Sequence, residues 1–252
     1  MSAPVADPGQ VGGLPPLLEP RRLGQQLATL LACEIVSGRM GPGQGFPSAE
    51  ELVTRYGVSR TVARETVQTL ALLGLVRVQH GKRTEILPPE EWDVLSAVVQ
   101  DALRREGKAS EFVRDVYVFR LLIEPKAAAL VAARGAPDVA AELDRLVQVM
   151  ESRAGGDGDG DVIMAADRDF HDTIARASGN RVIAGVSRDI REVLRTLWEL
   201  SRPAAEERRR MAEQHRRIVD AIVARDEEGA AAAMQEHLQW ATDADIGRLQ
   251  HG

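Results

Sequence analysis

The sequence of 252 residues contains a single cysteine, Cys33, so an internal disulfide is excluded. Lack of disulfides is typical of proteins that work in a reducing compartment. No apolar run approaches the roughly 18 residues that indicate a membrane-spanning helix. No basic segment followed by an apolar one marks a secretion signal. We therefore expect a cytoplasmic protein that does not enter a membrane.

Aromatic residues are few, at 4% of the chain, and positive charge is scarce overall, since the formal net charge is −6. An acidic balance taken over the whole chain disfavours binding of nucleic acid, because phosphate repels negative surfaces. The charge is unevenly distributed, however: residues 21–88 carry +4, which leaves −10 for the rest. Such asymmetry indicates a nucleic-acid-binding segment within an acidic protein.

Two short helices are predicted between residues 48 and 73. Ser48 and Glu51 have the spacing of a capping box, which starts a helix. Gly57 ends that helix, and Ser59 is placed to cap the next one. Two short helices joined by a tight turn predict a helix-turn-helix, in which the second helix enters the DNA major groove.

The second of these helices begins with polar and cationic side chains. Arg60 and Arg64 are four residues apart, so both guanidinium groups lie on one exposed face. Arginine reads guanine through two parallel hydrogen bonds. Two short alternating strands, 76–78 and 84–86, then flank a cationic tip at 79–83. This pattern predicts a winged helix-turn-helix rather than a purely structural three-helix unit.

The segment 46–86 resembles the DNA-binding domain of the GntR regulators, and QHGK at 79–82 is similar to the wing of the FadR branch. The resemblance, together with the cationic wing, assigns DNA contacts to Ser59, Arg60, Thr61, Arg64, His80, Gly81 and Lys82. One position departs from the family. Glu50 stands where the family usually has an arginine, and an acid cannot make that phosphate or base contact. Either the contact is lost, or the operator differs from the common one.

The remaining sequence predicts an almost wholly helical second domain. The predicted helices, including one before the winged unit, are 22–37, 91–106, 110–134, 137–153, 161–177, 181–201, 204–226 and 228–249. The expected fold is therefore mainly α, with a disordered tail at 1–20, a winged helix-turn-helix at 21–88 and an all-α helical bundle at 89–252.

Three of the five histidines fall in different helices of this second domain. Asp167 precedes His171 by four residues, so the two side chains share a helical face. His215 and His237 lie on the last two helices, which a short turn makes antiparallel neighbours. One carboxylate and three imidazoles form a normal ligand set for a divalent transition metal. A histidine on an amphipathic helix is also commonly solvated or hydrogen-bonded, so spacing alone leaves both interpretations open.

A second resemblance bears on these residues. The segments 167–180, 213–222 and 234–238 are similar to the three signatures of the FCD effector domain, which follows the winged helix in the FadR branch. In metal-containing members these positions are metal ligands, so the resemblance implies a metal held by Asp167, His171, His215 and His237. Zinc is the first expectation, with nickel, manganese or iron as alternatives.

Two further residues are candidates for binding an effector. Arg120 and Glu124 are four residues apart and resemble the R-x-x-x-E motif of the family. Arg120 either clamps a carboxylate through two hydrogen bonds or only pairs with Glu124. Asn180 either donates into the effector pocket or is only a turn residue.

These features predict a homodimeric, ligand-responsive transcription regulator rather than an enzyme. We expect a repressor that binds a palindromic DNA operator and senses a small carboxylate effector through the metal. One alternative is a metal-responsive regulator, in which the ion itself is the signal. Another is a metal-dependent hydrolase or lyase, but the sequence supplies no nucleophile elbow and no general base beyond the ligands.

Overall fold

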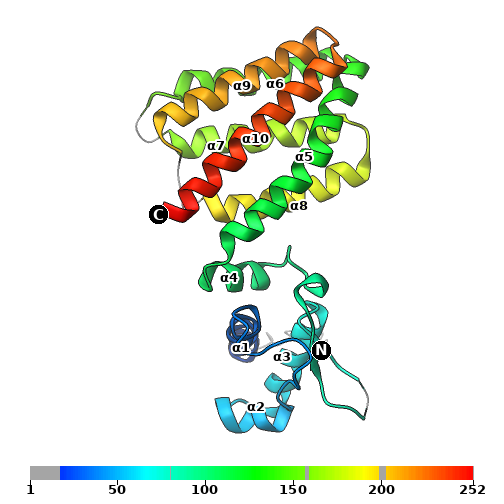
Figure 1. Cartoon of the computed structure of the whole chain (residues 1–252), viewed down its shortest axis with the longest axis vertical. Helices are drawn as coiled ribbons and strands as arrows, with labels where there is room; N and C mark the ends of the chain where they lie inside the picture. Colours follow the sequence, from blue (N-terminus) through cyan, green and yellow to red (C-terminus); the bar gives the residue numbers. More distant parts are fainter. Residues whose placement is uncertain (1–17, 80, 157–158, 199–202, 252) are drawn as a thin grey trace, which may run out of the picture. The chain divides into compact units, whose positions relative to one another are not determined.

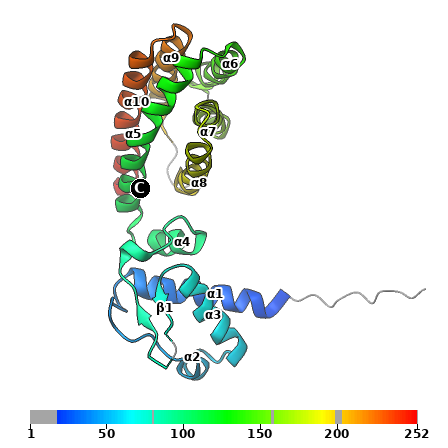
Figure 2. The same cartoon turned by 90° about the vertical axis from the view of Figure 1, so that its right-hand side faces the viewer.

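The computed structural model describes residues 18–79, 81–156, 159–198 and 203–251. These residues form mainly helices, together with one two-stranded sheet. The chain divides into two compact units, residues 1–102 and 103–252, each of which is treated by itself below (Figures 1 and 2). The expected fold class, a winged helix-turn-helix with a helical bundle, is confirmed.

The first unit begins with helix α1 (Leu18–Val36), four residues before its predicted start. The difference arises because Pro20 lies in the first helical turn, where a backbone N–H has no partner within the helix and proline is tolerated. The predicted disordered tail is therefore too long by the three residues 18–20, and its residues 1–17 lie outside the described part of the chain. Helix α1 packs against α3 (Arg60–Leu72), and the Thr66 hydroxyl donates to the Gly24 carbonyl at 3.4 Å across this contact.

The two helices of the helix-turn-helix start and stop where their caps predict. Ser48 caps α2 (Ala49–Tyr56), because its Oγ accepts from the Glu51 N–H at 3.2 Å while the Glu51 carboxylate accepts from the Ser48 N–H at 2.7 Å. Gly57 ends α2 in the left-handed region, at φ 65°, where glycine carries no Cβ penalty. The Ser59 Oγ accepts from the Val62 N–H at 3.2 Å and begins α3.

The wing is a short antiparallel ribbon of β1 (Val76–Arg77) and β2 (Glu85–Ile86). Each strand is one residue shorter than predicted, and the register pairs Val76 with Ile86 and Arg77 with Glu85. Val76 and Ile86 are buried, so the ribbon is anchored by its apolar side. The tip between the strands therefore projects cationic residues from a fixed base.

The predicted helix at 91–106 is only partly formed. The structure has a 3₁₀ turn, η1 (Pro89–Glu91), an irregular segment, and then α4 (Ala97–Arg105). The irregular segment is held to the first unit, because the Asp93 N–H donates to the Leu73 carbonyl at 2.8 Å. Trp92, just before Asp93, is extended, at ψ 141°, so the backbone leaves the helical path here and tertiary contact overrides local helix propensity.

The second unit is a bundle of long helices, whose predicted positions hold within a few residues. Its members after α4 are α5 (Ala109–Arg134), α6 (Pro137–Arg153), α7 (Gly160–Ala177), α8 (Arg181–Trp198), α9 (Ala205–Val223) and α10 (Glu227–His251). The predicted end of α8 at 199–201 falls outside the described residues. Within the described residues, no helix combines the length and apolarity that a bilayer crossing requires.

Packing within the bundle determines where its interior lies. Helix α10 runs along both α5 and α9, α6 packs on α7 and α9, and α7 also contacts α5 and α8 (Figure 2). Helices α5, α7, α9 and α10 thus surround one interior region. Tyr117, Phe170 and Met234 are buried there together with several charged residues, which is unusual for a hydrophobic core.

Candidate functional site

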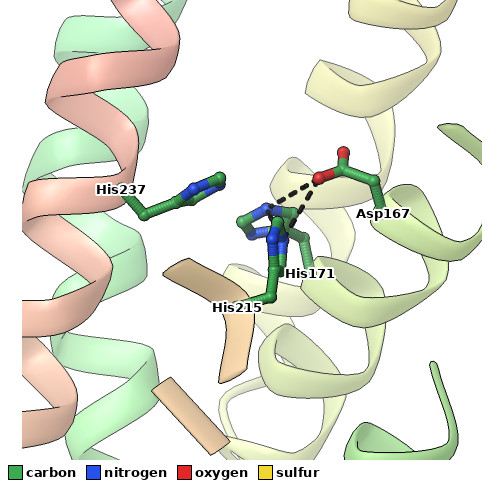
Figure 3. A group of neighbouring side chains, drawn as sticks. All are labelled: Asp167, His171, His215 and His237. Carbon is green, nitrogen blue, oxygen red and sulfur yellow. Dashed lines mark hydrogen bonds and ion pairs between the residues drawn. The ribbon is translucent and has the colours of Figure 1, made fainter. Parts of the chain in front are cut away.

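Four side chains of the types that can ligate a metal meet in the interior of the bundle. Asp167 and His171 come from α7, His215 from α9 and His237 from α10 (Figure 3). One ligand atom from each residue lies within 4.8 Å of the others, and all four residues are buried. The sequence prediction that three distant helices bring these side chains together therefore agrees with their positions.

The carboxylate of Asp167 faces two of the imidazole rings. Its Oδ1 lies 3.2 Å from His215 Nε2 and 3.7 Å from His171 Nε2. The two Nε2 atoms are themselves only 3.4 Å apart. Both rings thus present Nε2, rather than Nδ1, toward the centre of the cluster.

Each of the three histidines also has its Nδ1 beside a protein oxygen. The pairs are His171 with Glu124 Oε2 at 2.7 Å, His215 with the Met211 carbonyl at 2.7 Å, and His237 with Gln214 Oε1 at 3.2 Å. For His215 and His237 this contact is a hydrogen bond. A metal-ligating histidine almost always makes such a bond with its second ring nitrogen, which fixes the tautomer that leaves Nε2 free. The residues therefore fit a divalent transition metal held through Nε2 atoms and Asp167.

The pKa shifts of His237 and Asp167 leave both side chains in the protonation states that can bind a metal. Burial, reinforced by the nearby His215 and His171, holds the pKa of His237 well below its usual range, so that ring is neutral. Burial alone would raise the pKa of Asp167, but hydrogen bonds to His171 and His215 outweigh it and hold that pKa well below its usual range. An ionised carboxylate and a neutral imidazole are the forms that bind a metal.

Arg120 and Glu124 form a buried pair on α5. Arg120 Nε donates to Glu124 Oε1 at 2.7 Å, and Nη2 donates to Oε2 at 3.3 Å. The structural pairing that the sequence left open is thus present. Because Glu124 also faces His171, one carboxylate connects the guanidinium group of Arg120 to the histidine cluster.

A small cavity adjoins the cluster on the α10 side. Asp167 and His237 line it together with Arg120, Tyr117, Asp245 and Arg248. Burial, followed by the charge of Asp245, raises the pKa of Tyr117 well above its usual range, so its hydroxyl stays protonated and donates to Asp245. The cavity volume of about 30 Å³ admits only one or two water molecules. Arg120 thus belongs both to the Glu124 pair and to the cavity wall.

Asn180, the second predicted effector residue, is exposed and lies immediately before α8. Its Oδ1 accepts from the Val182 N–H at 2.9 Å and from the Ile183 N–H at 3.2 Å. These bonds are those of a helix N-cap. The turn interpretation thus has a direct structural basis, and Asn180 is not among the residues that line the cavity.

The predicted DNA-contact residues of the first unit are exposed at the start of α3 and on the wing. They are Ser59, Arg60, Thr61, Arg64, Gly81 and Lys82, whereas His80 lies outside the described residues. The Ser59 oxygen accepts the capping bond, so its O–H remains able to donate to phosphate. Arg64 and Lys82 line opposite sides of a groove of about 390 Å³ between α3 and the wing.

Glu50, at the start of α2, lies beside the first arginine of α3. Its Oε1 is 3.7 Å from Arg60 Nη2, and both side chains are exposed. Glu51 is committed to the capping box, so Glu50 is the acid of this turn that faces α3. The departure from the family pattern therefore affects an arginine that is expected to contact DNA.

Sequence reasoning missed the residues that surround the predicted ligands. Gln214 on α9 contacts the ring of His237 on α10, and no local spacing marks a residue as such a partner. The Met211 carbonyl, by contrast, lies one helical turn before His215 on the same helix. Arg191 on α8 is 4% exposed and was not predicted to have any role. The R-x-x-x-E motif predicts Glu124 only as the partner of Arg120, so it does not reveal the contact of Glu124 with His171.

Comparison with known protein families gives one match in each of the two units of the chain. The model of the bacterial regulatory proteins, gntR family, matches residues 23–86, and the FCD domain model matches residues 115–239. The chain belongs to the GntR family of bacterial regulators and carries an FCD domain. DNA binding and regulation of transcription are the activities of this family, and the FCD domain is its effector-binding part.

Curated relatives cover nearly the whole chain. The uncharacterized HTH-type transcriptional regulator YieP of Escherichia coli is 27% identical over 87% of this chain and 94% of its own length. The HTH-type transcriptional repressor NanR of Citrobacter rodentium is 28% identical over 86% and 83%, and LutR of Bacillus subtilis is 28% identical over 86% and 98%. A solved structure of Lar from Listeria monocytogenes matches with a TM-score of 0.56 at 16% identity, covering 88% of this chain and 96% of that one. This last likeness shows the fold alone.

Proposed function

We propose that this GntR-family protein is a homodimeric, cytoplasmic repressor that senses a small organic acid through a metal ion in its FCD domain. The observation that carries the proposal is the buried cluster of Asp167, His171, His215 and His237, in which the Nδ1 atoms of His215 and His237 are hydrogen-bonded and the Nε2 atoms of His171 and His215 face the carboxylate. Such second-ring hydrogen bonding is the arrangement that a metal site requires.

The four side chains would hold the ion, and the ion would supply a positive charge and free coordination positions for an acid. A divalent ion that accepts five or six ligands leaves one or two positions for carboxylate oxygens. Arg120 lies on the cavity wall beside the cluster and offers a second point of attachment. We therefore place the acid between the metal and Arg120.

The small size of the cavity supports a ligand-responsive role. At about 30 Å³ it has no room for an acid of several carbons, so the lining side chains must move when one binds. Tyr117, Asp245 and Arg248 are joined by hydrogen bonds at this wall, and a ligand would have to rearrange them. A ligand shifts operator affinity only through its different affinity for two states, typically by about 1–3 kcal/mol.

On the DNA side, we propose that Arg60 and Arg64 enter the major groove of one half-site of a palindromic operator, with Lys82 of the wing on adjacent phosphates. The exposure of these side chains, and the groove between α3 and the wing, support this placement. Binding should weaken with salt at a log–log slope of about −0.9 per phosphate neutralised. A flat salt response would contradict the proposed surface.

The decisive test of the effector half is elemental analysis of the purified protein, followed by operator titrations with a carboxylate panel before and after chelation. We expect about one metal per subunit, and an acid that weakens operator binding only while the metal is present. If chelation alone changes operator affinity and no acid does, the ion itself is the signal, as in a metal-responsive regulator. If purified protein takes up no added zinc, nickel, manganese or iron, the cluster is only structural.

A further inference from the structure

One face of α10 lines the cavity from the histidine cluster to the last turns of the helix. The lining residues from α10 recur at spacings of three and one: His237, Trp240, Ala241, Ala244, Asp245 and Arg248. Residues at such spacings share one helical face, and a rise of about 1.5 Å per residue makes this stripe about 16 Å long. His237 belongs to the cluster at one end, and Arg248 lies at the other end. Between them, Ala241 and Ala244 present only methyl groups, which suit contact with a carbon chain.

Contacts between α5 and α10 join the same two ends of the cavity. Arg120 is connected to the histidine cluster by one carboxylate. Its guanidinium carbon lies 5.0 Å from the centre of the Tyr117 ring, and the Tyr117 hydroxyl donates to Asp245. Asp245 in turn accepts from Arg248. Because all four of these residues line the cavity, direct contacts place Arg248 at the wall of the proposed effector site.

Arg248 has one buried donor without an acceptor. Its side chain is only 17% exposed, Nη1 donates to Glu207 of α9 at 2.7 Å, and Nη2 donates to Asp245. Its Nε is buried and has no hydrogen-bond partner among the residues that the structure describes. A buried donor on a charged group is costly to leave unpaired. An acceptor oxygen of a ligand in the cavity would therefore bind favourably at this atom.

A hydroxyl group matches this end of the cavity better than a second carboxylate does. A hydroxyl accepts one hydrogen bond while it donates another, so it can accept from Arg248 Nε and donate to the Asp245 carboxylate. A carboxylate only accepts, and it would lie beside Asp245, where like charges repel. A methyl group would meet neither residue. The chemistry of the two side chains thus favours a neutral group that both donates and accepts.

We propose that Arg248 binds a hydroxyl group of the effector, so that the preferred effector is a hydroxy acid with its carboxylate at one end and this hydroxyl near the other. This inference rests on the proposed acid-sensing function. The carboxylate binds at the metal and Arg120, and the carbon chain follows Ala241 and Ala244 of α10. The hydroxyl joins the hydrogen bonds of Asp245 and Arg248. Arg248 is thus the residue that determines specificity within the effector site.

The test compares acids that share a carbon chain and differ only at its far end. Butyrate, 4-hydroxybutyrate and succinate form one set, and hexanoate, 6-hydroxyhexanoate and adipate form another. Each acid is titrated calorimetrically into the zinc-loaded full-length protein. In at least one set we expect the hydroxy acid to bind about tenfold more tightly than both other members, because a hydrogen bond to a charged group is worth about that factor or more.

Arg248→Met should remove most of that preference, because it weakens binding of the hydroxy acid far more than binding of the alkyl acid. Methionine keeps an unbranched side chain but has no donor. The matched control is Arg217→Met, which removes an exposed arginine that also joins α9 to α10, by pairing with Glu236, but does not line the cavity. This control should keep the full preference. Should Arg248→Met lose its helical circular dichroism signal, Arg248→Lys provides the same test, because it keeps the charge but not the fork of donors.

The outcomes separate this inference from the function beneath it. Equal affinity of wild-type protein for the hydroxy and alkyl acids of both sets, or equal losses for both in Arg248→Met, would overturn the role of Arg248 and leave acid sensing intact. Tightest binding of the diacids would overturn the hydroxyl and assign this end of the cavity to a second carboxylate. If none of the six acids binds wild-type protein, acid sensing fails and the inference fails with it.

Discussion

The two units of the chain place their functional side chains in opposite environments. In the first unit, Arg60, Arg64 and Lys82 are exposed, and each can be changed without leaving a buried partner unmatched. In the second unit, Asp167 and His215 are buried and contact one another. A surface that binds a large polyanion needs only exposed charge on rigid elements, whereas a site for an ion and a small molecule must exclude water.

The difference predicts how far the effect of a substitution spreads. Removing an exposed cation should alter DNA binding and leave the fold alone, because surface changes usually cost little stability. Removing one member of the buried cluster should alter its neighbours as well, because the remaining polar groups lose partners. The predictions below test this contrast from the largest expected effect to the smallest.

Asp167→Asn should have the largest effect, because it removes the only acidic ligand among the four. The metal-dependent part of the stability, about 4 kcal/mol when free metal is a thousandfold above its Kd, should disappear. Thermal unfolding with and without chelator measures this increment. The matched control is Asp169→Asn, an exposed acid two residues along the same helix. An increment that survives in Asp167→Asn would contradict the ligand assignment.

Glu124→Gln should have the next largest effect, because Glu124 orients His171 without being a ligand itself. Loss of such an orienting carboxylate typically costs about 10–100-fold in metal affinity. Competition with a chromophoric chelator gives the Kd directly. Glu142→Gln is the control, since Glu142 pairs with Arg145 on the surface of α6. Unchanged metal affinity in Glu124→Gln would show that the Nδ1 contact is not part of the site.

Arg64→Ala tests the exposed side of the comparison. Operator affinity should fall by about 1–3 kcal/mol, with relaxed preference at one base position. The melting temperature and metal content should not change. Arg39→Ala is the matched control, because Arg39 is an exposed arginine of the same unit that pairs with Glu34. A loss of metal in Arg64→Ala would mean that the two sites are less independent than their burial suggests.

The first unit was predicted from its sequence in most details, because its signals are local. The capping box of Ser48 and Glu51, the turn at Gly57 and the cap at Ser59 each involve residues within four positions of one another. The helix expected at 91–106 was wrong at its start, where Trp92 is extended and the Asp93 N–H donates to the distant Leu73 carbonyl. Non-local hydrogen bonds of this kind are invisible to periodicity.

For the second unit, the sequence predicted the helices and the four side chains that cluster between them, but not the residues around this cluster. Asp167 and His171 share a helix face by spacing, which a sequence shows directly. That Gln214 contacts His237, or that Arg191 is buried and donates to Asp172, depends on how α7, α8, α9 and α10 pack. No pattern along one helix encodes such a contact, so the orienting residues emerge only from the folded structure.

Glu50→Gln should have the smallest effect and gives the finest test of the DNA surface. Glu50 lies 3.7 Å from Arg60, and an exposed pair of this kind is worth about 0–1 kcal/mol. Removing the negative charge should free Arg60 and lessen repulsion of phosphate, so we expect operator affinity to rise by about threefold, within that energy. The salt dependence should become steeper if Arg60 then binds phosphate.

The control for this prediction is Glu90→Gln, which removes an exposed acid from η1 rather than from α2. Selection of binding sites from a library with a randomised half-site shows whether Glu50 affects operator affinity alone or base preference as well. If Glu50→Gln binds all sites more tightly with an unchanged preference, Glu50 only weakens contact with the backbone. If the preference shifts at one base pair, Glu50 sets the direction of Arg60 and hence the operator sequence. Unchanged affinity and unchanged preference would mean that the Glu50–Arg60 pair does not persist on DNA.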